Sequence, residues 1–350
     1  MTEKIIIIGA GKTGRGFLAR LAAESNVPIS FIEKDPVLIR EMKNSGSYEV
    51  RFFGDVSEPV QIGGYTISSW EDADLSQTDL ILVAVGPSNL YDVGVSLRQK
   101  LPSGRPFRVI TCENAGGPAQ KLKDTIGMDY VQVSEAAVFC TTIEGEGLSI
   151  RSEKYPYLPY DSDLLPSYEP SVAGLQPTGH FQNFLKRKIF TYNAASGIIA
   201  YMGWLYGYEI YAQAANDPRI LDMLTRNYEA TDRALCREFG YLPAEQADFS
   251  ARSKAKFTNP EIEDTVSRNA RSALRKLGPT ERIFGPMELL KKHGEDTSIL
   301  EQTAAAALLY AKKAEHETVL PDEILKKAGD WMDSASKEAI LTCYHKLLTG

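Results

Sequence analysis

The sequence predicts an α/β protein in which a doubly wound, mostly parallel sheet is followed by a mainly α-helical domain. Short β-branched runs alternate with helical stretches over residues 1 to about 145, a pattern typical of a parallel sheet covered by helices. Beyond Phe181 the apolar spacing becomes long and helical, with little strand signal. A chain of 350 residues exceeds the size at which one core usually stops growing, so two domains are expected.

Five buried strands are expected in the first domain, at Lys4–Ile8, Ile29–Glu33, Leu80–Val85, Arg108–Cys112 and Tyr130–Val133. Four long helical runs are expected in the second, at Ile198–Tyr211, Ile220–Phe239, Ser298–Lys313 and Asp322–Lys346. The stretch Tyr155–Pro177 is rich in proline, tyrosine and aspartate, which opposes regular helix and predicts an inter-domain connection. The expected domains are therefore residues 1–180, which include this connection, and residues 181–350.

The charge balance and the absence of targeting signals favour a small-molecule partner. Acidic residues outnumber basic ones by 46 to 39, and the formal charge of −7 argues against a surface for nucleic acid or anionic membrane. The apolar run Ile5–Ile8 is too short for a signal peptide or a membrane span. The cysteines lack paired spacing, and the histidines lack the spacing of metal ligands. We therefore expect a cytoplasmic, metal-free protein with reduced thiols.

A glycine-rich turn follows the first strand. The segment GAGKTG reads G-x-G-x-x-G directly between a buried strand and an apolar-periodic helix. In this context Gly9 permits the tight turn, Gly11 removes a Cβ that would hit a pyrophosphate, and Gly14 lets the helix pack close to the strand. The helix N-terminus then meets the phosphate charge. The pattern predicts a Rossmann dinucleotide site formed by Gly9, Ala10, Gly11, Lys12, Thr13 and Gly14.

The end of the second strand supports the dinucleotide interpretation. Glu33 lies about 20 residues beyond the glycines, where a carboxylate can accept hydrogen bonds from the adenosine ribose hydroxyls. Its charge repels a 2′-phosphate and favours NAD over NADP, although Lys34 weakens that preference. The rival interpretation of Gly11–Thr13 as the GKT of a nucleoside-triphosphate loop fails on spacing, because the earlier glycine of that loop falls on Ile6.

The third strand ends in the turn AVGP. In a Rossmann domain this strand end lines the cofactor cleft, with Val85 at the edge and Gly86 allowing close approach of the backbone. A simple Gly-Pro turn explains the same pattern equally well.

Taken together, the segments GAGKTGRGF, AVGP, CEN, KIFTYN and LRKLGPTERI resemble the polyol-specific long-chain dehydrogenases of the mannitol dehydrogenase family. The resemblance spans nearly the whole chain in order and spacing. It implies that residues 1–180 bind NAD and that residues 181–350 form a helical substrate and catalytic domain. It also implies an NAD-dependent oxidoreductase that interconverts a secondary alcohol of a polyol or polyol phosphate and the corresponding ketose, without a metal. A monomer is expected, with a dimer as the alternative.

The resemblance also implies the catalytic residues. In the family a lysine removes the alcohol proton while hydride passes to the nicotinamide, and the matching residue is Lys188. Asn193 and Asn114 are implied to hold the developing alkoxide, and Asn114 also lies at the cofactor. An amine in a partly dry cleft loses its charge more readily, which suits a base. At about 100° per residue, Lys188, Asn193 and Ser196 fall within roughly 140° of one helical face. Without the resemblance, the residues alone favour a surface lysine, a helix-face amide and a turn former.

Two departures from the family lie in the implied pocket. Ser196 stands where the family has a histidine that orients the reacting oxygen, and a hydroxyl cannot carry positive charge. Phe139 and Cys140 stand where relatives have Asp and Arg, which predicts a less polar substrate pocket. Cys140 is either a reactive thiol or, more commonly, a packed one. These departures open an alternative function, a catalytically silent relative that binds NAD(H) or a sugar phosphate as a sensor. A third option is hydride chemistry on an amino or carboxylate substrate.

Basic residues near the end of the resemblance are candidates for a sugar phosphate. The segment LRKLGPTER matches a stretch in which the relatives direct basic residues at the substrate, which here implies Arg275, Lys276 and Arg282. Arginine suits phosphate through its planar fork and lysine as a point charge. A solvated basic helix end is the alternative interpretation.

Overall fold

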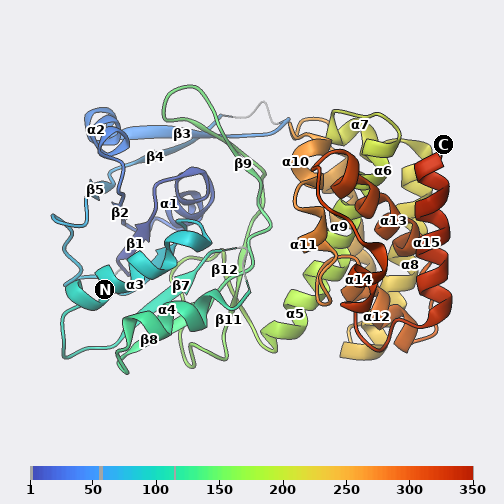
Figure 1. Cartoon of the computed structure of the whole chain (residues 1–350). Helices are drawn as coiled ribbons and strands as arrows, with labels where there is room; N and C mark the ends of the chain where they lie inside the picture. Colours follow the sequence, from blue (N-terminus) through green and yellow to red (C-terminus); the bar gives the residue numbers. More distant parts are fainter. Residues whose placement is uncertain (1–2, 55–57, 114–115, 350) are drawn as a thin grey trace. The chain divides into compact units, whose positions relative to one another are not determined.

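Two compact units make up the chain. The structure is a computed structural model that describes residues 3–54, 58–113 and 116–349. The first unit runs from Met1 to Phe181 and the second from Gln182 to Gly350. The first is built on a parallel sheet and the second on helices, which confirms the predicted fold class (Figure 1).

A six-stranded sheet organises the first unit. Its strands are β1 (Ile5–Ile8), β2 (Ile29–Ile32), β5 (Thr66–Ser68), β6 (Leu80–Val83), β7 (Phe107–Thr111) and β8 (Val131–Glu135). They lie in the order β5-β2-β1-β6-β7-β8, and all neighbours are parallel. Counted along the chain within this sheet, the order is 3-2-1-4-5-6. Ligands of such sheets bind where the order reverses, beyond the carboxyl ends of the first and fourth strands. In this chain that point lies beyond β1 and β6.

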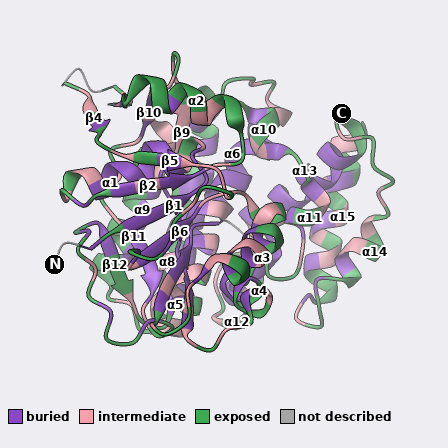
Figure 2. Cartoon of the chain, turned by 90° about the vertical axis from the view of Figure 1, so that its left-hand side faces the viewer, coloured by how far each residue is buried: buried purple, intermediate pink, exposed green. Residues whose placement is uncertain are grey.

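Helices cover both faces of this sheet. Ile5 and Ile7 of β1 pack in one cluster with the helix that follows β1, whereas Ile6 and Ile8 pack in another with α3 (Leu90–Lys100) and α4 (Pro118–Ile126). Successive side chains of a strand point to opposite faces, so a strand buried on both faces reads as an unbroken apolar run. Figure 2 shows these strands as buried. The helical elements are η1 (Gly14–Leu18), α1 (Ala19–Glu24), α2 (Pro36–Ser45), η2 (Pro87–Asn89), α3 (Leu90–Lys100) and α4 (Pro118–Ile126).

Two smaller sheets complete the first unit, and neither is among the predicted elements. One has the order β4-β3-β10-β9, and the other is the pair β11-β12. Their strands are β3 (Ser47–Phe52), β4 (Val60–Gly63), β9 (Thr142–Glu144), β10 (Ile150–Ser152), β11 (Leu158–Asp161) and β12 (Leu175–Thr178). These short strands mix polar and apolar residues, so their local pattern is weak and their pairing depends on partners distant in sequence.

The stretch Tyr155–Pro177 is more regular than a connection. It contains β11 and most of β12, which pair in parallel. Leu158 and Tyr160 are fully buried in the core of the first unit. The expectation of a linker was therefore wrong for this part of the chain. Its prolines exclude helix, but they are tolerated in this short pair, where the other edge of β11 is bonded only near Ala136 and Ala137.

Every named element of the second unit is a helix. The longer ones are α5 (Phe181–Lys188), α6 (Ala194–Leu205), α8 (Pro218–Phe239), α9 (Pro243–Thr258), α12 (Phe284–Lys292), α13 (Ser298–Lys313) and α15 (Ser334–Thr349). The shorter ones are η3 (Ile189–Asn193), α7 (Tyr211–Ala215), α10 (Val266–Ala270), α11 (Ala273–Lys276) and α14 (Pro321–Lys326). In the part of the chain that the structure describes, none of the helices has both the length and the apolar character needed to cross a membrane.

Two of the four predicted helical runs are interrupted. The run Asp322–Lys346 breaks between α14 and α15, where Gly329 has a φ of +113°. The run Ile198–Tyr211 breaks after α6, where Gly207 has a φ of +77°. A right-handed helix excludes positive φ, so each glycine ends the helical path. The apolar spacing continues across both breaks because the flanking helices face the same core.

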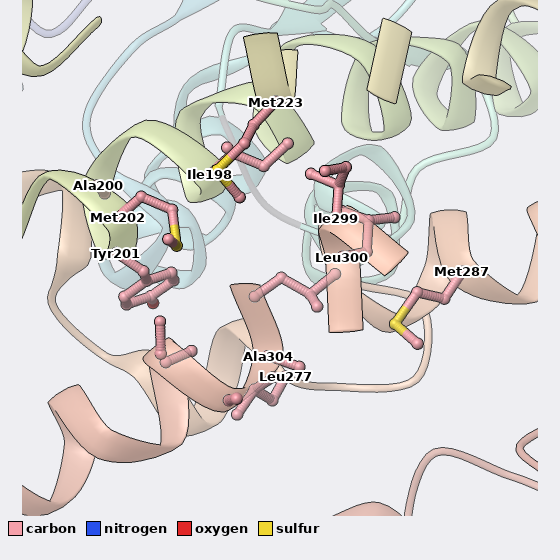
Figure 3. Packing of buried hydrophobic residues seen from close by; sticks show 14 of the residues in the cluster. Ile198, Ala200, Tyr201, Met202, Met223, Leu277, Met287, Ile299, Leu300 and Ala304 are labelled. Atoms are coloured by element: carbon pink, nitrogen blue, oxygen red, sulfur yellow. The ribbon is translucent and has the colours of Figure 1, made fainter. Parts of the chain in front are cut away.

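The core of the second unit centres on α6. Its residues from Ala194 to Gly203 are all buried. Figure 3 shows Ile198, Tyr201 and Met202 of this helix near Leu300 of α13. A helix that is apolar on every side requires neighbours all round it. This packing fixes the position of α6 and of the turn that precedes it.

Leu308→Ala is expected to lower the free energy of unfolding of the helical unit by about 2–5 kcal/mol. Leu308 is 0% exposed in α13, so its removal leaves a cavity. Urea unfolding followed by the fluorescence of Trp204 and Trp331 measures the change. The control is Leu242→Ala at a position 62% exposed, with an expected change below about 0.5 kcal/mol. Equal losses in the two variants would contradict this core.

Candidate active site

The glycine turn packs against the carboxyl ends of two strands. Gly9 has a φ of +96°, and a Cβ there would lie 2.3 Å from the carbonyl oxygen of Ala84, just beyond β6. A Cβ at Gly14 would lie 2.0 Å from the carbonyl oxygen of Gly9. Since no side chain fits at such distances, the protein's own packing requires both glycines. They hold the positions that the first and third glycines of a dinucleotide turn occupy.

Gly11 is not required by the packing of the protein. A Cβ at this position would meet no atom within 4 Å. Open space here fits a group that approaches the backbone closely, as a pyrophosphate does at the second glycine of this motif. Of its neighbours in the turn, Ala10 is fully buried, Thr13 is partly exposed and Lys12 is exposed.

The carboxylate of Glu33 lies at this turn. One oxygen accepts a hydrogen bond from the N–H of Ala10 at 2.7 Å. The other accepts from the N–H groups of Lys34 and Asp35 at 2.7 and 3.0 Å. A carboxylate has about four acceptor positions, so capacity remains for a ligand's hydroxyl groups. The amine of Lys34 donates to Asn89 Oδ1 at 3.1 Å, so this positive charge lies next to Asn89.

Glu113 fixes the turn that follows β6. Its Oε1 accepts hydrogen bonds from the N–H groups of Val85 at 2.6 Å and Gly86 at 2.8 Å. Burial raises the pKa of this carboxyl, and the two N–H groups oppose that rise. Gly86 has a φ of +85°, so the turn uses the freedom of glycine. Glu113 is not among the predicted site residues, although it is the middle letter of CEN. Asn114, the last letter, lies outside the described residues.

Arg15 is a second residue that the sequence prediction missed. It is 4% exposed, and its Nε donates to the carbonyl oxygen of Ala10 at 2.7 Å. Another guanidinium nitrogen donates to the carbonyl oxygen of Leu148 at 2.7 Å. Burial lowers the pKa of this group. Arg15 therefore ties the glycine turn to the segment before β10, a link that local sequence does not reveal.

Lys188 lies in the second unit, at the end of α5, and its side chain is buried. The residue is 9% exposed. Burial, and then the positive charges of Lys256 and Arg282, lower the pKa of its amine from 10.5 to about 7. A substantial fraction of the amine is therefore neutral near pH 7. A neutral amine in a buried setting can accept a proton from a hydroxyl.

A π-helical turn, η3, follows Lys188 directly and ends at Asn193. In such a turn the N–H bonds to the carbonyl five residues back, so residues five apart lie closer to one face than in an α-helix. Lys188 and Asn193 have that separation. In this turn the two side chains are therefore expected to lie closer together around the axis than the roughly 140° that a regular α-helix gives. Asn193 itself is partly buried.

Ser196 lies one turn further along, in α6, and is 8% exposed. The phenol of Tyr211 donates to its backbone carbonyl at 3.4 Å. A Cβ at the adjacent Gly197 would lie 3.5 Å from Cδ of Arg282, so the stem of Arg282 passes over this part of α6. Because Arg282 also lowers the pKa of Lys188, its guanidinium acts on the same region.

The three basic candidates of the 275–282 segment differ in their surroundings. Arg275 has a side chain 59% exposed and pairs with Glu281 at 2.7 Å, so a solvated basic helix end describes it well. Lys276 is 5% exposed and donates to the carbonyl of Asn269. Burial, then Arg282 and Arg275, lower the pKa of Lys276 to about 7.

Arg282 is the most enclosed guanidinium of this group. Its side chain is 16% exposed, and Glu281 lies 3.8 Å from its Nε. That buried Nε has no hydrogen-bond partner among the residues that the structure describes. A donor left in this state costs free energy and has capacity for an acceptor that a ligand brings. Arg282 is therefore the candidate best prepared to receive an anionic group.

Phe139 and Cys140 are buried in the first unit, at 6% and 8% exposure. Phe139 stacks on Tyr155 with ring centroids 5.5 Å apart and an angle of 11° between the planes. Sγ of Cys140 lies 3.3 Å from Oγ of Ser152. These contacts favour the interpretation of Cys140 as a packed thiol rather than a reactive one.

Metal-ligating side chains do not gather within residues 3–54, 58–113 and 116–349. No group of three or more His, Cys, Asp or Glu lies there in an arrangement that could hold an ion. The four cysteines are free thiols.

The fold and the glycine turn define a Rossmann protein with a helical C-terminal unit. Comparison with known families matches residues 3–143 to the mannitol dehydrogenase Rossmann domain. Residues 180–341 match the mannitol dehydrogenase C-terminal domain. The two matches follow one another and together cover most of the sequence. The chain belongs to the mannitol dehydrogenase family, which confirms the resemblance found in its motifs.

Individual relatives agree with this assignment. The mannitol-1-phosphate 5-dehydrogenase of Anoxybacillus flavithermus is 26% identical over 346 residues, covering 92% of this chain and 91% of the relative. A substrate-free D-sorbitol dehydrogenase structure matches with a TM-score of 0.79 at 13% identity, covering 99% of this chain and 93% of its own. Pseudomonas fluorescens mannitol 2-dehydrogenase, in a ternary complex with NAD and D-mannitol, matches with a TM-score of 0.75 at 15% identity, covering 99% and 92%. The two structural matches show a shared fold.

Gly14→Ala is expected to lower the thermal midpoint of the first unit, because its Cβ would meet the Gly9 carbonyl oxygen at 2.0 Å. Overpacking of this kind costs about 1–3 kcal/mol. Gly11→Ala is the matched variant and is expected to leave the midpoint unchanged or slightly raised. Thermal unfolding followed by the fluorescence of Trp70 measures both. A similar fall in the two variants would show that the space at Gly11 is filled.

Proposed function

We propose that this protein is an NAD-dependent oxidoreductase that interconverts a secondary alcohol of a polyol or polyol phosphate and the corresponding ketose. In this proposal residues 1–180 bind NAD, residues 181–350 supply the substrate and catalytic groups, and Lys188 is the general base in place of a metal. The observation that carries the proposal is the buried amine of Lys188, whose pKa is lowered to about 7. Membership of the mannitol dehydrogenase family supports the reaction class.

The first unit supplies the NAD site in this proposal. Open space at Gly11 fits a pyrophosphate, and the Glu33 carboxylate retains acceptor capacity for ribose hydroxyls. A carboxylate at that position also disfavours a 2′-phosphate. Val85 and Gly86, with Asn114, complete the proposed cofactor-binding residues. Bound there, NAD would supply the acceptor for the hydride of the carbinol carbon.

Lys188 and its neighbours handle the proton. The neutral amine accepts the proton of the substrate hydroxyl at Nζ, and the amide of Asn193 donates to the oxygen as negative charge develops on it. Asn114, which lies outside the described residues, is the second amide that the family resemblance implies for this role. Lys256 and Arg282 disfavour the ammonium form of Lys188, so the proton is released again rather than retained. In the reverse direction the protonated amine returns this proton to the ketose oxygen.

The basic side chains of the second unit favour a phosphorylated substrate. Lys276 and Arg282 are both largely buried, and the charge of Arg282 lowers the pKa of Lys276. Cations pressed together in this way gain free energy when a ligand brings a dianion. The buried Nε of Arg282, which lacks a partner among the described residues, adds a directed donor. Arg275 is exposed, and its guanidinium already forms an ion pair with Glu281.

One observation favours a second candidate, a relative that binds NAD(H) or a sugar phosphate without turnover. Ser196 stands in place of the family histidine, and Phe139 stacks on Tyr155 in the segment that lacks the family's Asp and Arg. Assays of NADH formation over a panel of polyols and polyol phosphates, run with and without Lys188→Met, separate the two candidates. Turnover that depends on Lys188 supports the enzyme, and NADH binding without turnover supports the sensor.

The rate of polyol oxidation at limiting substrate is expected to rise with pH and to level off above about 7, where the Lys188 amine becomes neutral. Ketose reduction is expected to fall over the same range, because it needs the protonated amine. Lys188→Met is expected to lower kcat at least 100-fold in both directions. Initial rates of NADH formation and consumption test this. They are measured between about pH 5.5 and 9, where the protein is expected to stay folded. A flat profile in both directions would contradict the lysine base.

Lys188→Met is also expected to raise the free energy of unfolding at pH 7. The pKa of the amine is about 7 in the folded protein against 10.5 ordinarily, so between these values the unfolded chain binds a proton that the folded one lacks. The free energy of unfolding therefore rises with pH between about 7 and 10.5. The methionine variant lacks the contribution of Lys188 to this rise. Lys276 contributes its own share in both proteins. Urea unfolding at pH 7 and 9.5 gives the comparison, and a methionine variant less stable than the parent at pH 7 would refute the expectation.

Gly11→Ala is expected to weaken NADH binding at least about 10-fold, or 1.4 kcal/mol, while leaving stability unchanged. Its methyl group would enter space that the protein leaves open and that the pyrophosphate is proposed to fill. The enhancement of NADH fluorescence on binding measures the Kd. The control is Gly63→Ala in the strand β4, where the new Cβ would approach other atoms no closer than 3.4 Å. Wild-type affinity in Gly11→Ala would place the dinucleotide elsewhere.

A further inference from the structure

A buried polar network lies beside the π-turn η3. Arg187, which precedes the turn, is 9% exposed. Its Nε donates to Oε1 of Gln246 at 2.6 Å, and its Nη2 donates to the carbonyl oxygen of Glu245 at 3.0 Å. Its guanidinium also lies 4.3 Å from the ring centroids of Tyr241 and Phe249. Hydrogen bonds and aromatic rings thus hold the guanidinium in one place.

Gln246 is the centre of this network and is 0% exposed. Its Nε2 donates to Oδ1 of Asp232 at 2.7 Å and to Oγ1 of Thr191, inside η3, at 3.3 Å. Ser250 Oγ donates to the same Asp232 oxygen at 2.6 Å. Arg187 can only donate and the Asp232 carboxylate can only accept, so one orientation of the amide satisfies both. Gln246 therefore links an arginine before the turn to a hydroxyl within it.

A π-turn needs such support from outside itself. The α-helix is the ordinary form, and π-turns are rare and persist as single turns. If η3 relaxed to α-helical bonding, residues five apart would separate by about 140° around the helix axis. The network opposes this, because it holds Arg187 at one end of the turn and Thr191 in its middle.

We propose that Gln246 and Arg187 are positioning residues, which keep η3 in the π form and thereby present Lys188 and Asn193 together to the substrate. The inference rests on the proposed function and adds to it the residues that set its geometry. Neither residue needs to touch the substrate. Their effect passes through Thr191 and the backbone of η3 to the side chains on either side of it.

Gln246→Met keeps the length of the side chain and removes its hydrogen bonds. We expect kcat to fall about 10- to 100-fold, as a displacement of about 1 Å at the reacting groups does. The KM for NAD is expected to stay unchanged, because the proposed NAD residues belong to the other unit. Nitrogen-15 NMR of the lysine amines, with Lys188 assigned by its methionine variant, is expected to show the pKa of Lys188 rising above about 7 as the turn loosens.

Thr191 provides a gentler pair of variants should Gln246→Met fail to fold. Thr191→Val removes the hydroxyl that Gln246 binds, and Thr191→Ser retains it. The valine variant is expected to reproduce the fall in kcat and the rise in the Lys188 pKa, and the serine variant is expected to restore both.

Thr303→Val is the control for lost stability. Thr303 is 0% exposed in α13, and its hydroxyl donates to the carbonyl of Ile299 at 2.7 Å, so the variant loses a buried hydrogen bond away from η3. It is expected to keep the kcat and the Lys188 pKa of the parent. Equal effects in Thr303→Val and Thr191→Val, or a Lys188 pKa unchanged in Gln246→Met and Thr191→Val, would overturn the inference. If the parent turns over no polyol, the proposed function fails, and the NMR comparison still decides whether the network positions Lys188.

Discussion

The burial of the Lys188 amine is the constraint on which the character of the second unit depends. Taking an ammonium out of water costs free energy, and here two further cations add to that cost. The amine responds by giving up its proton near neutral pH. A fold keeps such a group only when the packing around it is stable enough to hold it in place. That stability comes from the apolar core around α6, which follows Lys188 in the sequence and anchors the turn between them.

The first unit depends on close packing of a different kind. Gly9 packs against the carbonyl of Ala84 and Gly14 against that of Gly9, so closely that neither position tolerates a side chain. A Cβ at Gly11 would meet no atom within 4 Å. Buried polar residues then tie the turn to its surroundings: Glu33 and Arg15 bind its backbone, and Glu113 binds the neighbouring turn after β6. The strand order brings the two turns together at the point where doubly wound sheets bind ligands. Packed glycines and buried hydrogen bonds thus surround Gly11, the second glycine of the motif, where a Cβ would have space.

Much of this could be predicted from local patterns, and the failures have a common physical cause. Five of the six central strands were found because each is rich in β-branched and apolar residues, and the glycine turn because its context was complete. The sixth, β5, has only three residues and was missed. The short strands β3, β4 and β9 to β12 were missed because the pairing of these small sheets depends largely on partners distant in sequence. Glu113 and Arg15 were missed because a buried charged residue looks like a surface one until its hydrogen-bond partners are known. The break before α15 was hidden because apolar spacing continues through it.

The sequence by itself determined the α/β class and the position of the glycine turn, since both follow from periodicity or from residue types at short range. It pointed to Lys188 only through the resemblance to a family. Only the tertiary structure decided that this lysine is buried among cations and that the turn after it is π-helical. Desolvation depends on everything packed around a group, and the bonding of a helical turn responds to contacts such as those from Gln246, 55 residues away from Thr191. Neither the lowered pKa of Lys188 nor the π-helical form of η3 can therefore be predicted from the local sequence alone.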